Sequence, residues 1–177
     1  VLAAPAAAAS AAEMSGTDPR PADAQAERLF AAGRYAEAVP FAEQALATAT
    51  RLFGPDEPML AYFLNQLGKI YRAAGRLDEA APPFERALAL NERAYGPNSA
   101  QTAVSLNSLG VLHLSRGHAR RAEPLLARSL ALREALQGPD SAGVATALSN
   151  LGAALEHLGR AAEALPLHAR AVAIRER

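Results

Sequence analysis

Residues 54–95 read GPDEPMLAYFLNQLGKIYRAAGRLDEAAPPFERALALNERAY, and the Gly-Pro that begins this stretch returns after 42 residues at 96–97 and again at 138–139. A fixed period of about 20–50 residues is typical of a chain built from small repeated units. Each unit in such an array contacts mainly its neighbours, so the stack offers an extended surface instead of a single pocket. The period therefore predicts a repeat protein.

Many positions besides the dipeptide repeat in the same register. A degenerate fourth copy comes first, because Gly33 and Ala38 lie 42 residues before Gly75 and Ala80. The predicted units are residues 22–53, 54–95, 96–137 and 138–177. Positions identical in the three full copies include Leu64/Leu106/Leu148, Leu67/Leu109/Leu151, Gly68/Gly110/Gly152, Pro82/Pro124/Pro166, Arg86/Arg128/Arg170 and Glu92/Glu134/Glu176.

The first half of each unit has the spacing of an amphipathic helix. In residues 54–95, Leu64, Leu67 and Gly68 predict a first helix over 57–74 with one apolar face. Asp56 follows the Gly-Pro and is expected to cap this helix. Gly68 lies on the apolar face, where a missing side chain permits close approach of another helix.

The second half of each unit predicts a second helix, here over 77–95, which begins after Gly75. Pro82 lies early in this helix, and we expect a kink there and not a break. The short link makes each pair antiparallel. The fold class is therefore all-α, an α-solenoid of about four helix pairs. The eight predicted helices cover residues 20–32, 34–53, 57–74, 77–95, 99–116, 119–137, 141–158 and 161–177.

Composition limits the classes of function. The formal net charge is zero, which argues against general binding of nucleic acid or anionic membranes. The chain has no cysteine, which excludes disulfides and thiolate metal sites. No stretch approaches the roughly 20 apolar residues of a membrane-spanning helix, so membrane insertion is not expected.

The N-terminal residues 1–21 are expected to form a flexible leader rich in Ala and Pro. Ala9-Ser10-Ala11 has the form of a signal-peptidase site, so the leader is either the remnant of a secretory signal or a linker. These readings leave a bacterial periplasmic or secreted location and a cytoplasmic one equally open.

The residues at the repeated positions resemble those of the tetratricopeptide repeat (TPR) family. Leu-x-x-Leu-Gly-x-x-Tyr occurs at 64–71, followed by Gly75, Ala80 and Phe84. The period of 42 and the Glu-Pro-Leu-Leu at 123–126 are similar to the kinesin-light-chain type of this repeat. The resemblance implies a right-handed superhelix whose first helices line a concave face that holds a peptide or a partner helix.

The resemblance also indicates which first-helix columns point to the concave face. Asn65 and Asn107 are the strongest candidates, because an amide can both donate to and accept from a peptide backbone. The alternative is that Asn only fills a polar helix position. Ser149 breaks the column, and its neighbour Asn150 is expected to turn away. The concave-face residues predicted are Asp23, Glu27, Phe30, Tyr62, Asn65, Lys69, Arg72, Ala73, Val104, Asn107, Val111, Leu114, Ser115, Thr146, Ser149, Ala153, Glu156 and His157.

Charged side chains on this face are mixed in sign. Lys69 and Arg72 lie one turn apart and would favour an acidic ligand group, unless they form only a solvated helix face. Asp23 and Glu27 lie at the other end of the face. A separate basic turn contains Arg116, His118, Arg120 and Arg121, and a solvated patch explains it better than a nucleic-acid site.

No catalytic, cofactor or metal site is predicted. His113 and His168 occupy apolar columns and are expected to pack in the core, and only His157 is expected to face the groove. No two histidines have the i, i+4 spacing of a helical zinc site. No nucleophile and base are spaced as a catalytic triad requires.

The sequence thus favours a non-enzymatic scaffold that binds a peptide or helix of another protein. The alternative is a regulatory or substrate-docking segment of a larger bacterial enzyme or signalling protein, which the parent reading frame would reveal. The apolar residues of the last predicted helix, 161–177, also suggest an end-to-end homodimer.

Overall fold

Eight α-helices, and no strand, make up residues 18–176, the part of the chain that the computed structural model describes. The helices are α2 (Arg20–Ala31), α3 (Tyr35–Phe53), α4 (Leu60–Ala73), α5 (Leu77–Tyr95), α6 (Ala100–Ser115), α7 (Ala119–Gln137), α8 (Ala142–His157) and α9 (Ala161–Arg175). The predicted all-α solenoid of four helix pairs is therefore confirmed. Residues 1–17 of the expected leader lie outside the described part.

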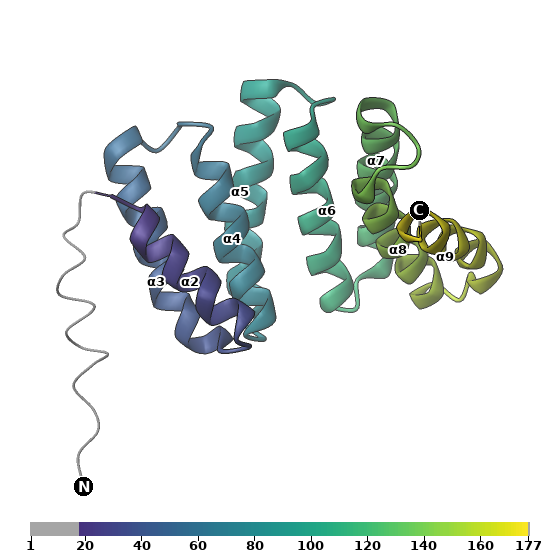
Figure 1. The fold of residues 1–177 in the computed structure, drawn as a ribbon, viewed down its shortest axis with the longest axis horizontal. Helices are drawn as coiled ribbons and strands as arrows, with labels where there is room; N and C mark the ends of the chain where they lie inside the picture. Colours follow the sequence, from purple (N-terminus) through teal and green to yellow (C-terminus); the bar gives the residue numbers. More distant parts are fainter. Residues whose placement is uncertain (1–17, 177) are drawn as a thin grey trace, which may run out of the picture.

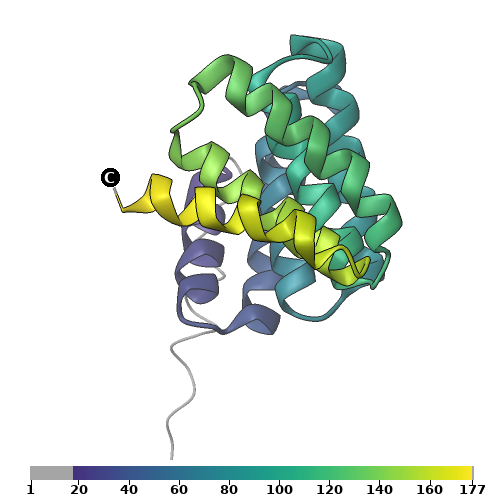
Figure 2. The ribbon, with the colours of Figure 1, turned by 90° about the vertical axis from the view of Figure 1, so that its right-hand side faces the viewer.

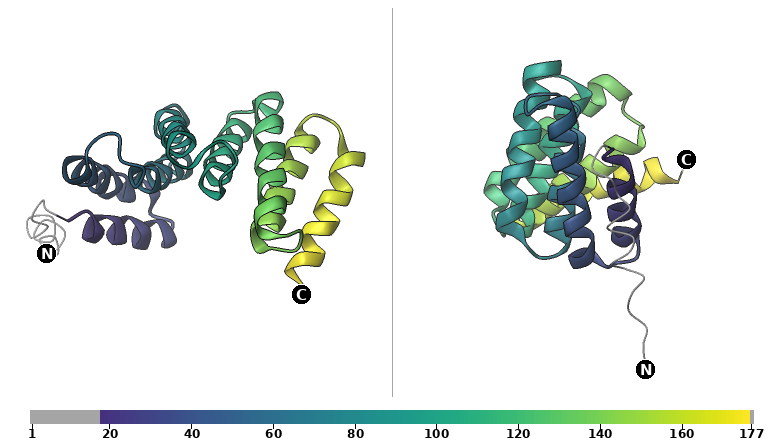
Figure 3. Two further views of the ribbon diagram at one scale, coloured as in Figure 1. Left: turned by 90° about the horizontal axis from the view of Figure 1, so that it is seen from above. Right: turned by 90° about the vertical axis from the view of Figure 1, so that its left-hand side faces the viewer.

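The helix pairs lie in a row along the chain (Figure 1). Each helix packs mainly on the helices before and after it, and the first helices α4, α6 and α8 also contact one another in sequence. The last pair is turned strongly against the central ones, as views from two further sides show (Figures 2 and 3). The first helices therefore share one continuous side of the array.

Glycines end the helices at the two kinds of turn. Gly75 has a φ of 77° between α4 and α5, and the next residue, Arg76, donates its N–H to the Tyr71 carbonyl at 2.9 Å. This pairing satisfies a carbonyl at the helix end that would otherwise lack a partner. Gly54 has a φ of 91° at the end of α3, and the following Pro55 has no N–H to continue the helix. The predicted stop between units is confirmed.

The start of α4 differs from the prediction. The helix begins at Leu60, three residues after the expected start at 57, and its N-cap position holds Met59 without a capping side chain. Asp56 instead accepts a hydrogen bond from Arg93 Nη2 at 3.0 Å. The prediction that Asp56 caps α4 was wrong, because Pro58 separates it from the helix. In the next unit Ser99 does cap α6, accepting from the Thr102 N–H at 3.1 Å.

A glycine in the first helix of each full pair lets the second helix pack closely against it, and we call this contact the glycine notch. A Cβ atom added to Gly68 would lie 2.8 Å from the Phe84 ring, and one added to Gly110 would lie 2.7 Å from Leu126. The equivalent atom on Gly152 would lie 2.6 Å from His168, which places this histidine in the helix interface. The predicted role of these glycines is confirmed. The second helices continue without a break through their interior prolines, Pro82 among them.

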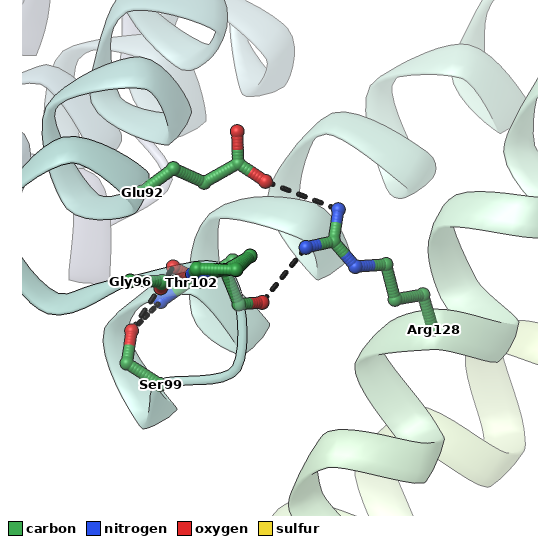
Figure 4. A network of polar contacts seen from close by, with 6 residues as sticks. Glu92, Gly96, Ser99, Thr102 and Arg128 are labelled. Atoms are coloured by element: carbon green, nitrogen blue, oxygen red, sulfur yellow. Dashed lines mark hydrogen bonds and ion pairs between the residues drawn. The ribbon is translucent and has the colours of Figure 1, made fainter.

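An arginine joins neighbouring pairs. Arg128 donates to the Pro97 carbonyl at 2.7 Å and to Glu92 Oε1 at 3.0 Å, so one side chain links α7, the Gly-Pro turn and α5 (Figure 4). Arg86 and Arg170 donate in the same way to the carbonyls of Pro55 and Pro139. We call this recurring contact the arginine clamp. It fixes the start of each unit against its own second helix.

Candidate functional site

Three adjoining hollows lie along the first helices α2, α4 and α6. The first, of about 370 Å³, is lined by Pro58, Met59, Ala61, Tyr62, Asn65, Gln66, Asn91, Tyr95, Gln101 and Val104. The second, of about 380 Å³, is lined by Asn65, Gln66, Lys69, Arg72, Phe84, Val104, Asn107, Ser108, Val111 and Asn150. The third, of about 210 Å³, is lined by Glu27, Phe30, Ala31, Gln66, Lys69 and Ile70.

These hollows share lining residues, so they form one continuous depression that we call the groove. Asn65 and Val104 line both the first and the second hollow, and Gln66 lines all three. Nine of the eighteen predicted concave-face residues line the groove, and Ser149 and His157 are among those that do not. The nine are Glu27, Phe30, Tyr62, Asn65, Lys69, Arg72, Val104, Asn107 and Val111.

The amide of Asn65 is only partly used within the protein. Its Nδ2 donates to the Ala61 carbonyl at 2.8 Å and to Ser105 Oγ at 3.3 Å. Its Oδ1 is buried and has no hydrogen-bond partner among the described residues. A buried oxygen without a partner is unfavourable, commonly by about 1–3 kcal/mol. The Asn65 amide therefore retains capacity to accept a hydrogen bond.

Asn107 is joined to the next unit. Its Oδ1 accepts a hydrogen bond from Asn150 Nδ2 at 2.8 Å, and both residues line the second hollow. The prediction that Asn150 turns away from the groove was wrong. Asn150 on α8 thus faces α6, the first helix of the preceding unit. Gln66 on α4 also faces the preceding first helix, because its Nε2 donates to Glu27 Oε1 on α2 at 2.7 Å.

Ser149 and His157 have other surroundings. Ser149 Oγ donates to the Ala145 carbonyl at 3.1 Å and accepts from Arg175 Nη2 at 3.0 Å. His157 lines a separate hollow of about 530 Å³ beside the turn before α7, together with His118, Arg120 and Arg121. The Asn column thus ends at Asn107 within the groove.

Two carboxylates at the α2 side of the groove share one phenol. Tyr62 Oη hydrogen-bonds to Asp23 Oδ2 at 2.9 Å and to Glu27 Oε1 at 3.1 Å. Desolvation raises the pKa of Asp23; the Tyr62 hydrogen bond opposes this change and the charge of Glu27 adds to it. Burial, followed by the bond to Asp23, raises the pKa of Tyr62 to about 12, so the phenol keeps its proton at neutral pH.

The cationic side chains of the groove differ in their contacts. Lys69 Nζ lies 4.2 Å from the centroid of the Phe30 ring, a cation–π arrangement. Arg72 is half-buried and lines the second hollow, and no described residue forms a hydrogen bond or ion pair with its guanidinium group. Arg72 is therefore the freer of the two cations for an acidic group.

The sequence reasoning missed part of the first hollow. Asn91 comes from α5 and is only 4% exposed, and its Nδ2 donates to Ser105 Oγ at 2.9 Å. Tyr95 and Gln101 lie on either side of the Gly-Pro turn and also line this hollow. A signal was present for Asn91, because the same column holds Arg133 and Arg175 in the other copies. A polar column near the end of an amphipathic second helix could have indicated it.

The remaining titratable groups do not gather around the groove. Desolvation, and then the nearby Arg121 and His118, lower the pKa of His113. Within residues 18–176, no group of three or more His, Asp or Glu side chains is arranged to hold a metal ion. No helix in the same range has both the length and the apolar character needed to cross a bilayer.

Stacked antiparallel helix pairs with a groove along their first helices define the class of α-solenoid repeat proteins. The family model for the tetratricopeptide repeat matches residues 24–93, 64–135 and 119–177, so this chain belongs to the tetratricopeptide repeat family.

Solved structures agree with this assignment. BtubC (BKLC) from P. vanneervenii is 28% identical with a TM-score of 0.74, over 86% of this chain and 61% of that one. The chain thus corresponds to about three fifths of that protein's length. A putative kinesin light chain from Podosopora anserina with nearly identical TPR-like repeats is 22% identical with a TM-score of 0.74, over 95% and 81%. MamA MSR-1 C2 is 22% identical with a TM-score of 0.55, over 84% and 72%. No curated protein matches the chain.

Proposed function

We propose that this protein is a non-enzymatic scaffold that binds a peptide or helix of a partner protein in the groove. Tetratricopeptide repeats generally mediate protein–protein interactions, which gives the class of function. The groove supports this proposal, because it is a continuous depression over α2, α4 and α6 that combines exposed apolar side chains with amides. A partner segment running along the array would contact several first helices in turn.

One observation carries the proposal. Asn65 stands where the first and second hollows join, and its Oδ1 lacks a partner among the described residues. A rotation of the Asn65 side chain would bring this buried oxygen to the groove surface, where a peptide N–H supplies the missing donor whatever the peptide sequence. Asn107 lines the neighbouring hollow and can exchange its bond to Asn150 for a ligand bond. The two amides would then hold the backbone of one extended segment.

The test is a selection of random dodecapeptides on the full chain, followed by affinity measurements on Asn65→Ala with Asn107→Ala. The double variant should bind the selected peptides at least about tenfold more weakly, equivalent to about 1.4 kcal/mol. Asn98→Ala is the matched control, because Asn98 is an exposed amide in the Gly-Pro turn outside the groove. Circular dichroism should show equal helicity for all three proteins. Unaltered peptide affinity in the double variant would reject the groove assignment.

A second surface supports contact between two copies. Leu165 and Val172 on α9, at the C-terminal end of the array (Figure 2), are 71% and 49% exposed. Val172 stands in the column of Leu130, which is only 9% exposed because α8 covers it. We propose that α9 of one copy stacks on another copy. Light scattering should then show a mass that rises with concentration in wild type but not in Val172→Lys, whereas a concentration-independent monomer would reject the stacking.

A further inference from the structure

We propose that the groove selects peptides in which a basic residue, held by Asp23 and Glu27, lies close to a large apolar residue that enters the first hollow. This inference rests on the proposed function and narrows its ligand. It depends on two adjoining features, an apolar hollow between α4 and α6 and a pair of carboxylates on α2 that lack a cation.

The apolar feature is the first hollow. Four large side chains around it are exposed, with exposed fractions of 52% for Met59, 48% for Tyr62, 49% for Tyr95 and 45% for Val104. None of its lining residues, all of which the structure describes, carries a charge. Its volume of about 370 Å³ falls in the range of about 300–1,000 Å³ that is common for ligand pockets. Clustered exposed apolar side chains of this kind mark interaction sites.

The carboxylate feature borders this hollow at Tyr62. The phenol has one proton to donate, yet both Asp23 Oδ2 and Glu27 Oε1 lie within hydrogen-bond distance of its oxygen. Glu27 has a further neutral donor in Gln66 Nε2 at 2.7 Å. Among the described residues, no Lys or Arg forms an ion pair with either carboxylate. Two adjacent negative charges are thus supported only by neutral donors.

Other carboxylates in the array have the cationic partner that Asp23 and Glu27 lack. Glu79 pairs with Arg76, and Glu92 pairs with Arg128 at 3.0 Å. Lys69 lines the third hollow together with Glu27, but its ammonium is placed over the Phe30 ring. A ligand cation would supply the missing charge on the Tyr62 side of the pair. Charge complementarity therefore identifies the ligand group that faces Asp23 and Glu27 as Lys or Arg.

The order of features along the array predicts the order of the ligand groups. The carboxylates lie on α2, the apolar hollow lies between α4 and α6, and the bonded amides Asn107 and Asn150 lie between α6 and α8. A segment that follows the first helices would place its basic residue first, its large apolar residue next and an extended backbone run last. A ligand helix would present the same groups on one face.

The test compares peptide selections on four forms of the full chain. A library of random dodecapeptides displayed on phage is selected on wild type, Asp23→Asn with Glu27→Gln, Asn65→Ala with Asn107→Ala, and the control Glu85→Gln. Glu85 is an exposed carboxylate on α5 outside the groove. Wild type and the control should enrich Lys or Arg within a few residues of a large apolar residue. The Asp23/Glu27 variant should keep the apolar preference but lose the basic one.

Affinities then separate the two proposals. A selected basic peptide should bind the Asp23/Glu27 variant at least about tenfold more weakly at low salt, a difference that shrinks as salt screens the charges. No enrichment of basic residues on wild type, or equal enrichment on the Asp23/Glu27 variant, overturns the inference while leaving peptide binding intact. Selected peptides that tolerate loss of both Asn65 and Asn107 overturn the proposed function instead.

Discussion

The contacts that hold each helix pair together recur every 42 residues, whereas the side chains of the groove change from copy to copy. The arginine clamp uses Arg86, Arg128 and Arg170 in the same way, each on the carbonyl of its Gly-Pro turn. The groove column that begins with Tyr62 continues with Val104 and then Thr146.

Two different requirements explain this difference. Packing contacts within and between units must fit the same shape in each copy, so their residues are constrained to repeat. A groove that recognises one ligand needs different chemistry at each step along that ligand. The positions where the period fails, such as Ser149 after Asn65 and Asn107, are therefore the positions to examine for specificity.

We expect the largest loss of stability at the glycine notch between the two helices of a pair. Gly68→Leu places atoms where even a Cβ would lie 2.8 Å from the buried Phe84 ring. Overpacking of this kind commonly costs about 1–3 kcal/mol, and we expect the upper end because Phe84 is only 2% exposed. Urea denaturation measures the loss. Ala89→Leu, at an exposed position on α5 outside the notch, should change stability little, and similar stability of both variants would contradict the notch.

The groove should respond in binding and not in stability. Val104→Asp puts a charge into the apolar first hollow, so the affinity for selected peptides should fall at least about tenfold. Because Val104 is 45% exposed, its free energy of unfolding should change by no more than about 0.5 kcal/mol. Fluorescence anisotropy with a labelled peptide measures the affinity. Ala127→Asp, exposed on α7, is the control, and equal peptide affinity of the two variants would argue against the groove.

The arginine clamp should contribute a smaller amount of stability. Arg128→Ala removes the bonds to the Pro97 carbonyl and to Glu92, but the side chain is 42% exposed. We expect a loss of about 1 kcal/mol in urea denaturation, since exposed ion pairs contribute little and the carbonyl bond adds to it. Arg120→Ala, at an exposed arginine near the start of the same helix, should leave the free energy of unfolding unchanged. An unchanged free energy of unfolding in Arg128→Ala would mean that the clamp repeats without stabilising the array.

The smallest effect concerns Asp23. Desolvation, followed by the nearby Glu27 charge, raises its folded pKa above the ordinary 3.8, so the folded state binds the proton more tightly than the unfolded state. Stability then falls as pH rises through this range. Asp23→Asn removes that loss, so its melting temperature at pH 7 should equal or slightly exceed that of wild type, and the difference should disappear below about pH 4. A clear loss of stability at pH 7 would show that the carboxylate is structural.

The sequence was sufficient to predict the features that depend on residues close to one another along the chain. Gly54 and Gly75 marked helix ends, and the recurring Leu and Gly columns gave the helix pairs and their apolar faces. The first turn of α4 could not be placed, because Pro58 shifts the helix start away from Asp56. The signal that corrects this start, Pro58, was itself present in the sequence.

The candidate site could be predicted only in part. The resemblance to the tetratricopeptide repeat, together with helical spacing, indicated Asn65 and Asn107 as groove residues. The bond from Tyr62 to Asp23 spans 39 residues and depends on how α2 and α4 pack against each other, which no pattern in the sequence reports. The bond from Asn150 to Asn107 likewise joins two first helices, so the sequence alone assigned Asn150 to the wrong side.

Hydrogen exchange of the full chain with and without a selected peptide tests the central claim most directly. If the groove is the binding site, saturation should slow amide exchange in α2, α4 and α6, whose side chains line it, and leave the turn at 117–121 unchanged. Protection confined to that turn and to 157–158, which line the separate hollow, would contradict the claim that the irregular columns of the first helices form the binding site.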